Sequence, residues 1–245
     1  QQEIILGQAG VAMLKALGYK PTIYHMNEGH SSFLILELIY NLMKEKQISF
    51  PIARDIISAK TVFTTHTPVP AGNDIFPIEL VEKYFKDFWP RLGLTREEFL
   101  KLGMKPCDNL EQGFNMGILA LKIAGKKNGV SKLHGWVSQK MFAPLWNGYF
   151  PEENHVGYVT NGVHFPTWTA TEWRKIYDKY FDPNFMNDQS NEEIWHGIYN
   201  VSDDEIWKTR MALKQKLVDY IREKFTESWL RNQGDPARVV SLLQR

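Results

Sequence analysis

Residues 22–30 read Thr22-Ile23-Tyr24-His25-Met26-Asn27-Glu28-Gly29-His30, a β-branched and aromatic run that stops at a polar cluster. Two later stretches repeat this layout: Thr61–Thr65 is followed by His66-Thr67-Pro68, and Val156–Thr160 is followed by Asn161-Gly162-Val163-His164. Short apolar runs bounded by turn residues are typical of buried strands. The pattern therefore predicts three strands of an α/β sheet, each ending at His or Asn side chains.

The polar clusters indicate a ligand-binding edge. In open α/β sheets, ligands bind outside the carboxyl ends of the strands. The three clusters offer uncharged hydrogen-bonding groups beside one carboxylate, that of Glu28. Polyhydroxylated ligands need many donors and acceptors but few full charges. The first hypothesis is therefore a sugar-binding cleft.

Composition narrows the classes of partner. The chain has 245 residues, with 29 Lys and Arg against 28 Asp and Glu. That balance leaves no excess positive charge to hold nucleic acid or an anionic membrane surface, so neither partner is expected. The single cysteine, Cys107, excludes an internal disulfide, and no apolar run of the sequence is long enough to span a membrane. A cytoplasmic setting is the expectation.

The chain ends are expected to lie inside structural elements. A helical period already runs over Ile4–Leu17, with Gly18 as its C-cap. Residues 239–245 also have the pattern of an element that continues. Both ends are therefore interpreted as cut ends of a longer fold.

Helical and β patterns alternate between the strands. Helices are predicted over 31–46 and 51–59, so the first third of the chain has the pattern of a doubly wound α/β domain with right-handed crossovers. A helical insertion is expected near 73–112, with a helix over 78–89 and a capping box at Thr95–Glu98. Residues 114–121 fit a helix, and a strand over 116–121 fits almost as well. A turn is predicted at 127–129, followed by a helix over 131–142.

The region after Asn161 is predicted to be helical. Capping boxes at Thr169–Glu172 and Ser202–Glu205 mark expected helix starts. A long helix is predicted over 203–225. Apolar residues gather on one of its faces, as expected for a helix that lies across another surface.

Several polar residues at strand ends are candidates for a site. His66 lies in a turn rich in proline and glycine, and either faces a ligand or ties the loop to the sheet. Asn161 either binds a ligand or only tolerates the left-handed backbone of a turn. Glu28, at a helix start, either interacts with the helix dipole or orients a substrate hydroxyl. A metal site is disfavoured, because His25 and His30 are five residues apart, whereas two ligands on one helical face are four apart.

Four motifs occur in the same order as in one known family. They are residues 24–33 (YHMNEGHSSF), 63–74 (FTTHTPVPAGND), 128–135 (NGVSKLHG) and 159–164 (VTNGVH). Together they resemble the α-glucan (glycogen or maltodextrin) phosphorylases, in the shorter prokaryotic branch. The likeness runs from near Gln1 to beyond Trp173, and the chain resembles a central fragment of such a protein.

The resemblance implies a fold, a reaction and a set of site residues. Family members bind substrates between two Rossmann-like domains of a glycosyltransferase-type fold. They transfer the terminal glucose of an α-1,4-glucan to inorganic phosphate, giving glucose 1-phosphate, and use the phosphate of pyridoxal phosphate as proton donor and acceptor. By resemblance, His66 is the catalytic residue that contacts the transferred glucose, and Asn161 binds one of its hydroxyls. Asn27, Glu28 and His30 line the active-site side of the first domain.

The domain organisation is also implied by the resemblance. Residues 1–166 are similar to the latter part of the N-terminal Rossmann-like domain, and 167–245 to the helical segment that leads into the C-terminal domain. Asn128–His134 would pack close to the cofactor.

Two family features have no counterpart in this sequence. The lysine that binds pyridoxal phosphate, in a segment resembling Lys-Ala-Ser-Gly, is absent, and so is the glycine-rich loop expected before Gln1. The isolated chain is therefore expected to be inactive. Two alternatives stay open: a nucleotide-sugar glycosyltransferase of similar fold, and a non-catalytic glucan-binding unit. Whether a homodimer forms is also left open.

Overall fold

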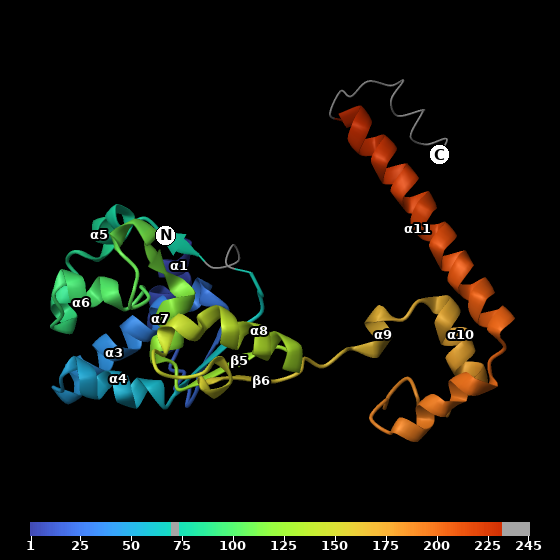
Figure 1. Ribbon diagram of the computed structural model, residues 1–245, viewed down its shortest axis with the longest axis horizontal. Coiled ribbons are helices and arrows are strands. Elements are labelled where there is room, and N and C mark those ends of the chain that lie inside the picture. Colours follow the sequence, from blue (N-terminus) through green and yellow to red (C-terminus); the bar gives the residue numbers. More distant parts are fainter. Residues whose placement is uncertain (70–73, 232–245) are drawn as a thin grey trace. The chain divides into compact units, whose positions relative to one another are not determined.

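The computed structural model describes residues 1–69 and 74–231 (Figure 1). The parts of the predicted motifs and elements at residues 70–73 and 239–245 lie outside the described residues. The chain forms two compact units, unit 1 (Gln1–Asn161) and unit 2 (Gly162–Arg245). The domain boundary expected between residues 166 and 167 stays a prediction.

Unit 1 is built on a four-stranded parallel sheet. Its strands are β1 (Tyr24–Asn27), β2 (Thr61–Thr65), β5 (Lys126–Gly129) and β6 (Val156–Tyr158), in the order β1-β2-β5-β6. In the register of the sheet, Asn27 is beside Thr64, Thr64 beside Asn128, and Asn128 beside Gly157. The strands expected from the β-branched runs are present, and an α/β fold with a parallel sheet flanked by helices is confirmed.

The turn predicted at residues 127–129 is wrong, because these residues form β5 between β2 and β6. Lys, Asn and Gly have low strand propensity. Pairing on both sides nevertheless satisfies the backbone of β5, and Asn128 Oδ1 accepts a hydrogen bond from Thr64 Oγ1 at 3.1 Å. The neighbouring Lys127 is partly buried, and this desolvation lowers the pKa of its ammonium. Tertiary pairing therefore overrides the local preference for a turn.

Helices fill the connections between the strands. Unit 1 contains α1 (Gln2–Ile4), a π-helical turn (Ile5–Ala9), α2 (Gly10–Ala16), α3 (Phe33–Lys46), α4 (Phe50–Ser58), α5 (Ile78–Phe85), α6 (Arg96–Lys101), α7 (Met116–Ile123) and α8 (Lys132–Phe142). The helices predicted over 31–46, 51–59 and 131–142 are confirmed within two residues at each end. Residues 116–121 are helical, so the alternative strand is wrong.

The connecting helices lie on one face of the sheet. Met26 and Phe63 point towards this face and are fully buried in the core. Figure 1 shows α8 above β5 and β6. The helix α7 contacts β2. On the opposite face, His25, Asn27 and Lys126 are exposed. Right-handed crossovers between strands added in one direction place every helix on the same face, so the doubly wound arrangement is not found in the described part of unit 1.

The insertion between β2 and α7 packs on α3. It contains α5, α6 and an antiparallel pair, β3 (Ile75–Phe76) with β4 (Phe114–Asn115). The rings of Phe33, Phe85, Phe99 and Phe114 form its core, with contacting centroids 4.6 to 6.2 Å apart. The capping box at Thr95 is confirmed. The helix predicted over 78–89 ends at Phe85, and a 3₁₀ turn follows at Trp89–Leu92.

Unit 2 is helical, as predicted. It contains α9 (Phe165–Trp168), α10 (Thr171–Tyr180), a 3₁₀ segment (Glu192–Asn200) and α11 (Asp203–Arg231). Its small core is aromatic: the Phe185 ring lies 4.7 to 4.9 Å from the rings of Tyr177, Phe181 and Trp195, between centroids.

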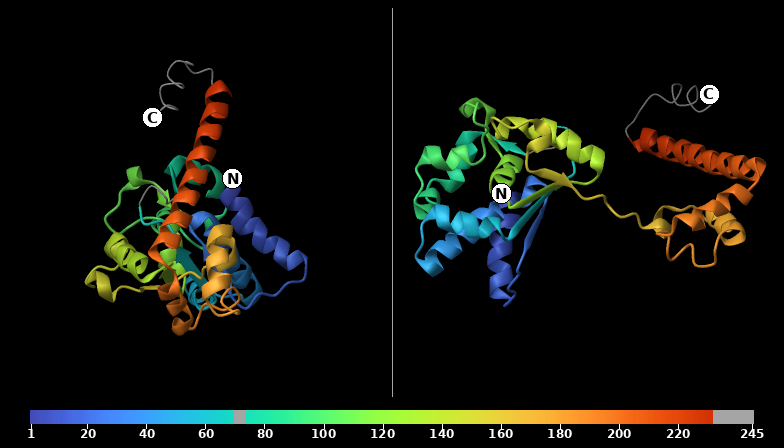
Figure 2. Two further views of the ribbon diagram at one scale, coloured as in Figure 1. Left: turned by 90° about the vertical axis from the view of Figure 1, so that its right-hand side faces the viewer. Right: turned by 60° about the horizontal axis from the view of Figure 1, so that its bottom comes forward.

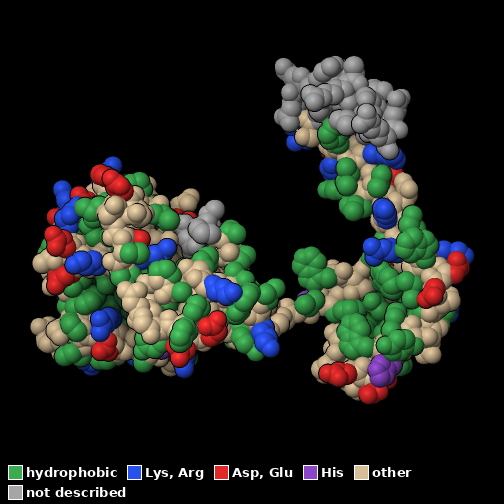
Figure 3. Space-filling model, in the orientation of Figure 1, with side chains coloured by type: hydrophobic (Ala, Val, Ile, Leu, Met, Phe, Trp, Pro, Cys, Tyr) green, Lys and Arg blue, Asp and Glu red, His purple; other side chains and the backbone are tan. Residues whose placement is uncertain are grey.

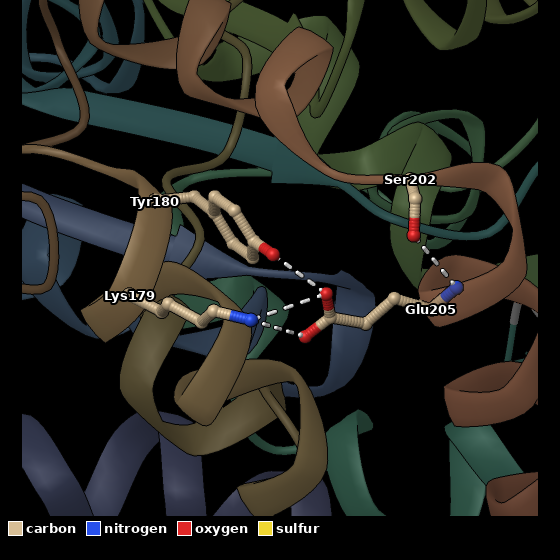
Figure 4. A network of polar contacts seen from close by, with 4 residues as sticks. All are labelled: Lys179, Tyr180, Ser202 and Glu205. Carbon is tan, nitrogen blue, oxygen red and sulfur yellow. Dashed lines mark hydrogen bonds and ion pairs between the residues drawn. The ribbon is translucent and has the colours of Figure 1, made fainter.

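Neither capping box predicted in unit 2 is complete. The Thr169 hydroxyl donates to a carbonyl of α9, and α10 has no side-chain cap. Ser202 Oγ accepts a hydrogen bond from the Glu205 amide at 3.3 Å. The Glu205 carboxylate instead accepts bonds from the Tyr180 hydroxyl at 2.7 Å and from Lys179, which joins α10 to α11 (Figure 4). A tertiary contact therefore replaces the local bond.

The helix predicted over 203–225 is confirmed and extends to Arg231. It is one unbroken rod in both views of Figure 2. Trp207, Leu217 and Ile221 are each more than half exposed on it, and Figure 3 shows hydrophobic side chains along its length. Within residues 1–69 and 74–231, no helix is both long enough and apolar enough to cross a membrane.

Candidate functional site

Hydrogen bonds to the side chain of Glu28 link the carboxyl ends of β1 and β2. Its Oε1 accepts hydrogen bonds from the backbone amides of His66 and Thr67, the second at 2.8 Å. The Glu28 side chain is buried, with the residue 7% exposed. An ionised carboxylate has only acceptors, and bonds from N–H groups to it are stronger than bonds between neutral groups. Glu28 therefore holds the turn that carries His66.

His66 follows the last residue of β2. Its side chain is partly buried, and its Nε2 atom is buried with no hydrogen-bond partner among the described residues. Buried ring nitrogens normally find a partner. The turn expected to orient the ring includes residues 70–73, which lie outside the described residues. What is described places His66 at the carboxyl edge of the sheet, as predicted from its position after a strand.

His30 and Asn27 lie at the same end of β1. His30 Nδ1 is 2.5 Å from Asp74 Oδ2, and the His30 ring is half exposed. This contact joins the 3₁₀ turn Gly29–Ser31, which precedes α3, to the segment after residue 73. Asn27 is the last residue of β1 and is exposed. Both residues are exposed, and their binding roles stay predictions.

Asn161 lies at the end of the chain segment that follows β6. Its amide donates to the Val130 carbonyl at 3.1 Å, and the amide of Val159 donates to the Gly129 carbonyl at 2.9 Å. These bonds extend the pairing of β5 and β6 beyond the strands. The Asn161 residue is exposed. The hydrogen bonds of the described residues therefore connect His66 to β1 and Asn161 to β5, and none joins His66 to Asn161.

A hydrogen-bonded row crosses three strands on the exposed face. Thr64 Oγ1 donates to Asn128 Oδ1, so it accepts from His25 Nε2, which lies 2.7 Å away and carries the proton. Sequence reasoning missed this row, although the alternation of side chains along paired strands could have indicated it. Within the described ranges, no three His, Cys, Asp or Glu side chains are grouped to hold a metal ion.

Hydrogen bonds and a close backbone approach connect β5 to α8 through the segment between them. Ser131 Oγ accepts the His134 amide at 3.1 Å and caps α8. The Val130 amide donates to His134 Nδ1 at 3.1 Å, so the proton of this buried ring is on Nε2, facing the Ser138 hydroxyl at 3.4 Å. A Cβ on Gly129 would lie 2.8 Å from the backbone of α8. The motif at residues 128–135 therefore packs β5 closely against α8.

Comparison with known proteins identifies the family. The family model described as carbohydrate phosphorylase matches residues 11–232. The chain belongs to the carbohydrate phosphorylases. This confirms the resemblance carried by the four motifs.

Curated phosphorylases are similar over nearly the whole chain. A glycogen phosphorylase of Mycobacterium tuberculosis (strain CDC 1551 / Oshkosh) is 36% identical over 98% of this chain and 28% of its own length. A maltodextrin phosphorylase of Thermococcus litoralis is 38% identical over 93% of this chain and 26% of its own length. A glycogen phosphorylase of Aquifex aeolicus is 35% identical over 98% of this chain and 34% of its own length. The chain therefore spans about a quarter to a third of the length of these relatives.

In this carbohydrate phosphorylase chain the candidate residues form two groups. Glu28, His66 and the pair of His30 with Asp74 surround the ends of β1 and β2. Asn161 belongs to the ends of β5 and β6. The two groups lie along one edge of one parallel sheet, because the carboxyl ends of parallel strands share an edge. This edge supplies ring nitrogens, amide groups and carboxylates, which suit hydrogen bonding to sugar hydroxyls.

Proposed function

We propose that the protein to which this chain belongs is an α-1,4-glucan phosphorylase. It transfers the terminal glucose of glycogen or maltodextrin to inorganic phosphate and releases glucose 1-phosphate. The match to the carbohydrate phosphorylase family carries this proposal. The names of the relatives, glycogen and maltodextrin phosphorylase, support the substrate class. The enzyme is a glycosyltransferase of the cytoplasm, and this chain alone is inactive.

The site of this reaction lies at the carboxyl edge of the sheet. His66 contacts the transferred glucose, and Asn161 binds one of its hydroxyls. The position of His66 directly after β2, at the carboxyl edge of the parallel sheet, supports its role. Asn27, Glu28 and His30 line the same side. Residues 1–166 contribute the latter part of one Rossmann-like domain and 167–245 lead into a second, with substrates bound between the two.

The cofactor of the longer protein is pyridoxal phosphate, whose phosphate supplies and accepts a proton. Lys122 and Lys127, whose ammonium pKa values are lowered by partial desolvation, do not fit the role of attachment site. The Lys122 ammonium donates to the carbonyls of Lys101 and Met104. Lys127 lies near the amino end of β5, opposite the edge that carries His66. We propose that the attachment site lies outside this chain.

The decisive experiment measures glucose 1-phosphate release from maltoheptaose and inorganic phosphate, with pyridoxal phosphate added. It compares this chain with the longest reading frame that contains it. Release by the longer protein alone is the expected result. If neither protein releases glucose 1-phosphate although the longer one is folded and binds cofactor, the proposal is wrong.

Two other functions would give different results in the same assay series. A nucleotide-sugar glycosyltransferase would bind a sugar nucleotide and show no response to pyridoxal phosphate. A glucan-binding unit would bind maltooligosaccharides saturably, without release that depends on phosphate. The family match favours the phosphorylase over both.

A further inference from the structure

Glu28 has a backbone conformation that side chains rarely adopt. Its φ of 63° and ψ of 179° fall in a region that is occupied almost only by glycine. The conformation is held from both sides: the Glu28 amide donates to the Thr64 carbonyl at 2.9 Å, and Gly29 is packed against Met116 and Gly117 of α7. Strained residues of this kind cluster at functional sites, where the surrounding structure maintains them.

The carboxylate of Glu28 uses this conformation to reach a loop that is distant in sequence. Its Oε1 accepts two adjacent amides, those of His66 and Thr67, 38 and 39 residues further along the chain. Hydrogen bonds from two adjacent N–H groups to one oxygen fix the orientation of the peptide group between His66 and Thr67. This peptide group contains the carbonyl of His66 and is bonded to the α-carbon that carries the His66 ring. Glycine at position 28 would relieve the strain but could not make these bonds.

We propose that Glu28 is a positioning residue for His66. Its carboxylate holds the turn after β2 so that the ring and carbonyl of His66 stand where the transferred glucose binds. The role of His66 in this inference rests on the proposed function, whereas the clamp itself is a property of the described chain. Glu28 then acts on the reaction through His66, and its own contact with sugar is not required.

The clamp is tested first in the 245-residue chain, by amide hydrogen exchange of His66 and Thr67. In Glu28→Ala and Glu28→Gly both amides are expected to exchange at least about tenfold faster, because their acceptor is gone. Glu28→Gln keeps an acceptor oxygen of equal reach and is expected to stay near the wild-type rate. Glu98→Ala is the matched control, since Glu98 also accepts a backbone amide but lies on the insertion. Unchanged exchange in Glu28→Gly, with the fold retained, overturns the proposal.

The positioning role is tested in the longest reading frame that contains the chain. Glu28→Ala and Glu28→Gly are both expected to lower kcat about 100-fold, with little change in the KM for phosphate, because the loss is one of alignment. Glu28→Gln is expected to recover most of the activity. The double variant Glu28→Ala/His66→Ala is expected to be no slower than His66→Ala alone.

Other results in these assays have distinct meanings. Additive losses in the double variant show that Glu28 acts independently of His66 and overturn the positioning role. Recovery of activity in Glu28→Gly shows that backbone shape, and not the carboxylate, is what matters, and also overturns it. If the wild-type longer protein releases no glucose 1-phosphate, the proposed function fails, and the exchange measurement still decides whether the clamp exists.

Discussion

The carboxylates of Glu28 and Glu98 both accept hydrogen bonds from backbone amides, but they stabilise different kinds of structure. Glu28 is buried, and its bonds join the ends of β1 and β2. Glu98 is in an exposed first turn of α6, where its bonds with Thr95 close a capping box. The bond from the Thr95 amide is the largest cause of the lowered pKa of Glu98. The first contact needs the tertiary structure, and the second needs only four adjacent residues.

The capping box makes stability depend on pH in a defined direction. The folded-state pKa of Glu98 lies below its ordinary value of 4.5. The stabilisation from its ionised form is therefore complete above pH 4.5 and is lost as the pH falls through the folded-state pKa. Glu98→Gln is expected to lower the urea midpoint at about pH 7 and to have a smaller effect at about pH 2.5. Equal effects at both pH values would show that the charge of Glu98 contributes nothing.

At the scale of elements, the N-terminal helix shows two glycines with opposite roles. The helix runs through α1, a π-helical turn and α2, and it packs on α3. A Cβ on Gly7 would lie 2.7 Å from the Leu34 amide nitrogen and 3.0 Å from the Cβ of Phe33. A Cβ on Gly10 would meet nothing within 4 Å. Gly7 therefore permits close helix packing, whereas Gly10 only adds freedom to the unfolded chain.

This difference predicts opposite effects of one substitution. Gly7→Ala is expected to destabilise the fold by about 1–3 kcal/mol, because the neighbouring α3 backbone has to shift. Gly10→Ala is expected to stabilise it by about 0.5–1 kcal/mol, since alanine has the better helix propensity. Urea unfolding of the two variants beside the wild type measures both values. Equal and small effects would mean that the π-helical turn does not press against α3.

At the scale of the whole molecule, each unit has a core of its own. Unit 1 is centred on Phe63 and its neighbours between the sheet and the helices, and unit 2 on Phe185 within its aromatic cluster. Both rings are 1% exposed. Separate cores predict separate unfolding, since a core residue stabilises the elements that it contacts.

The expected test compares Phe185→Ala with Phe63→Ala by hydrogen exchange under mild urea. Each change is expected to destabilise its own unit by about 3–5 kcal/mol through loss of the buried ring. Phe185→Ala should speed exchange in α10 and leave β2 protected, and Phe63→Ala should do the reverse. Loss of protection in both units together, with either variant, would mean that they unfold as one.

Local patterns and motifs in the sequence were enough to place β1, β2 and β6, the main helices, the Thr95 capping box and the family, because each depends on residues close together in the chain. They also placed His66 at a strand end. The formation of β5 by Lys126–Gly129, the placing of the helices on one face, and the contact of His30 with Asp74 were settled only by the tertiary structure. So was the bond of Glu28 to the His66 amide, 38 residues away. These features depend on hydrogen bonds and pairings between distant segments, which no local preference encodes.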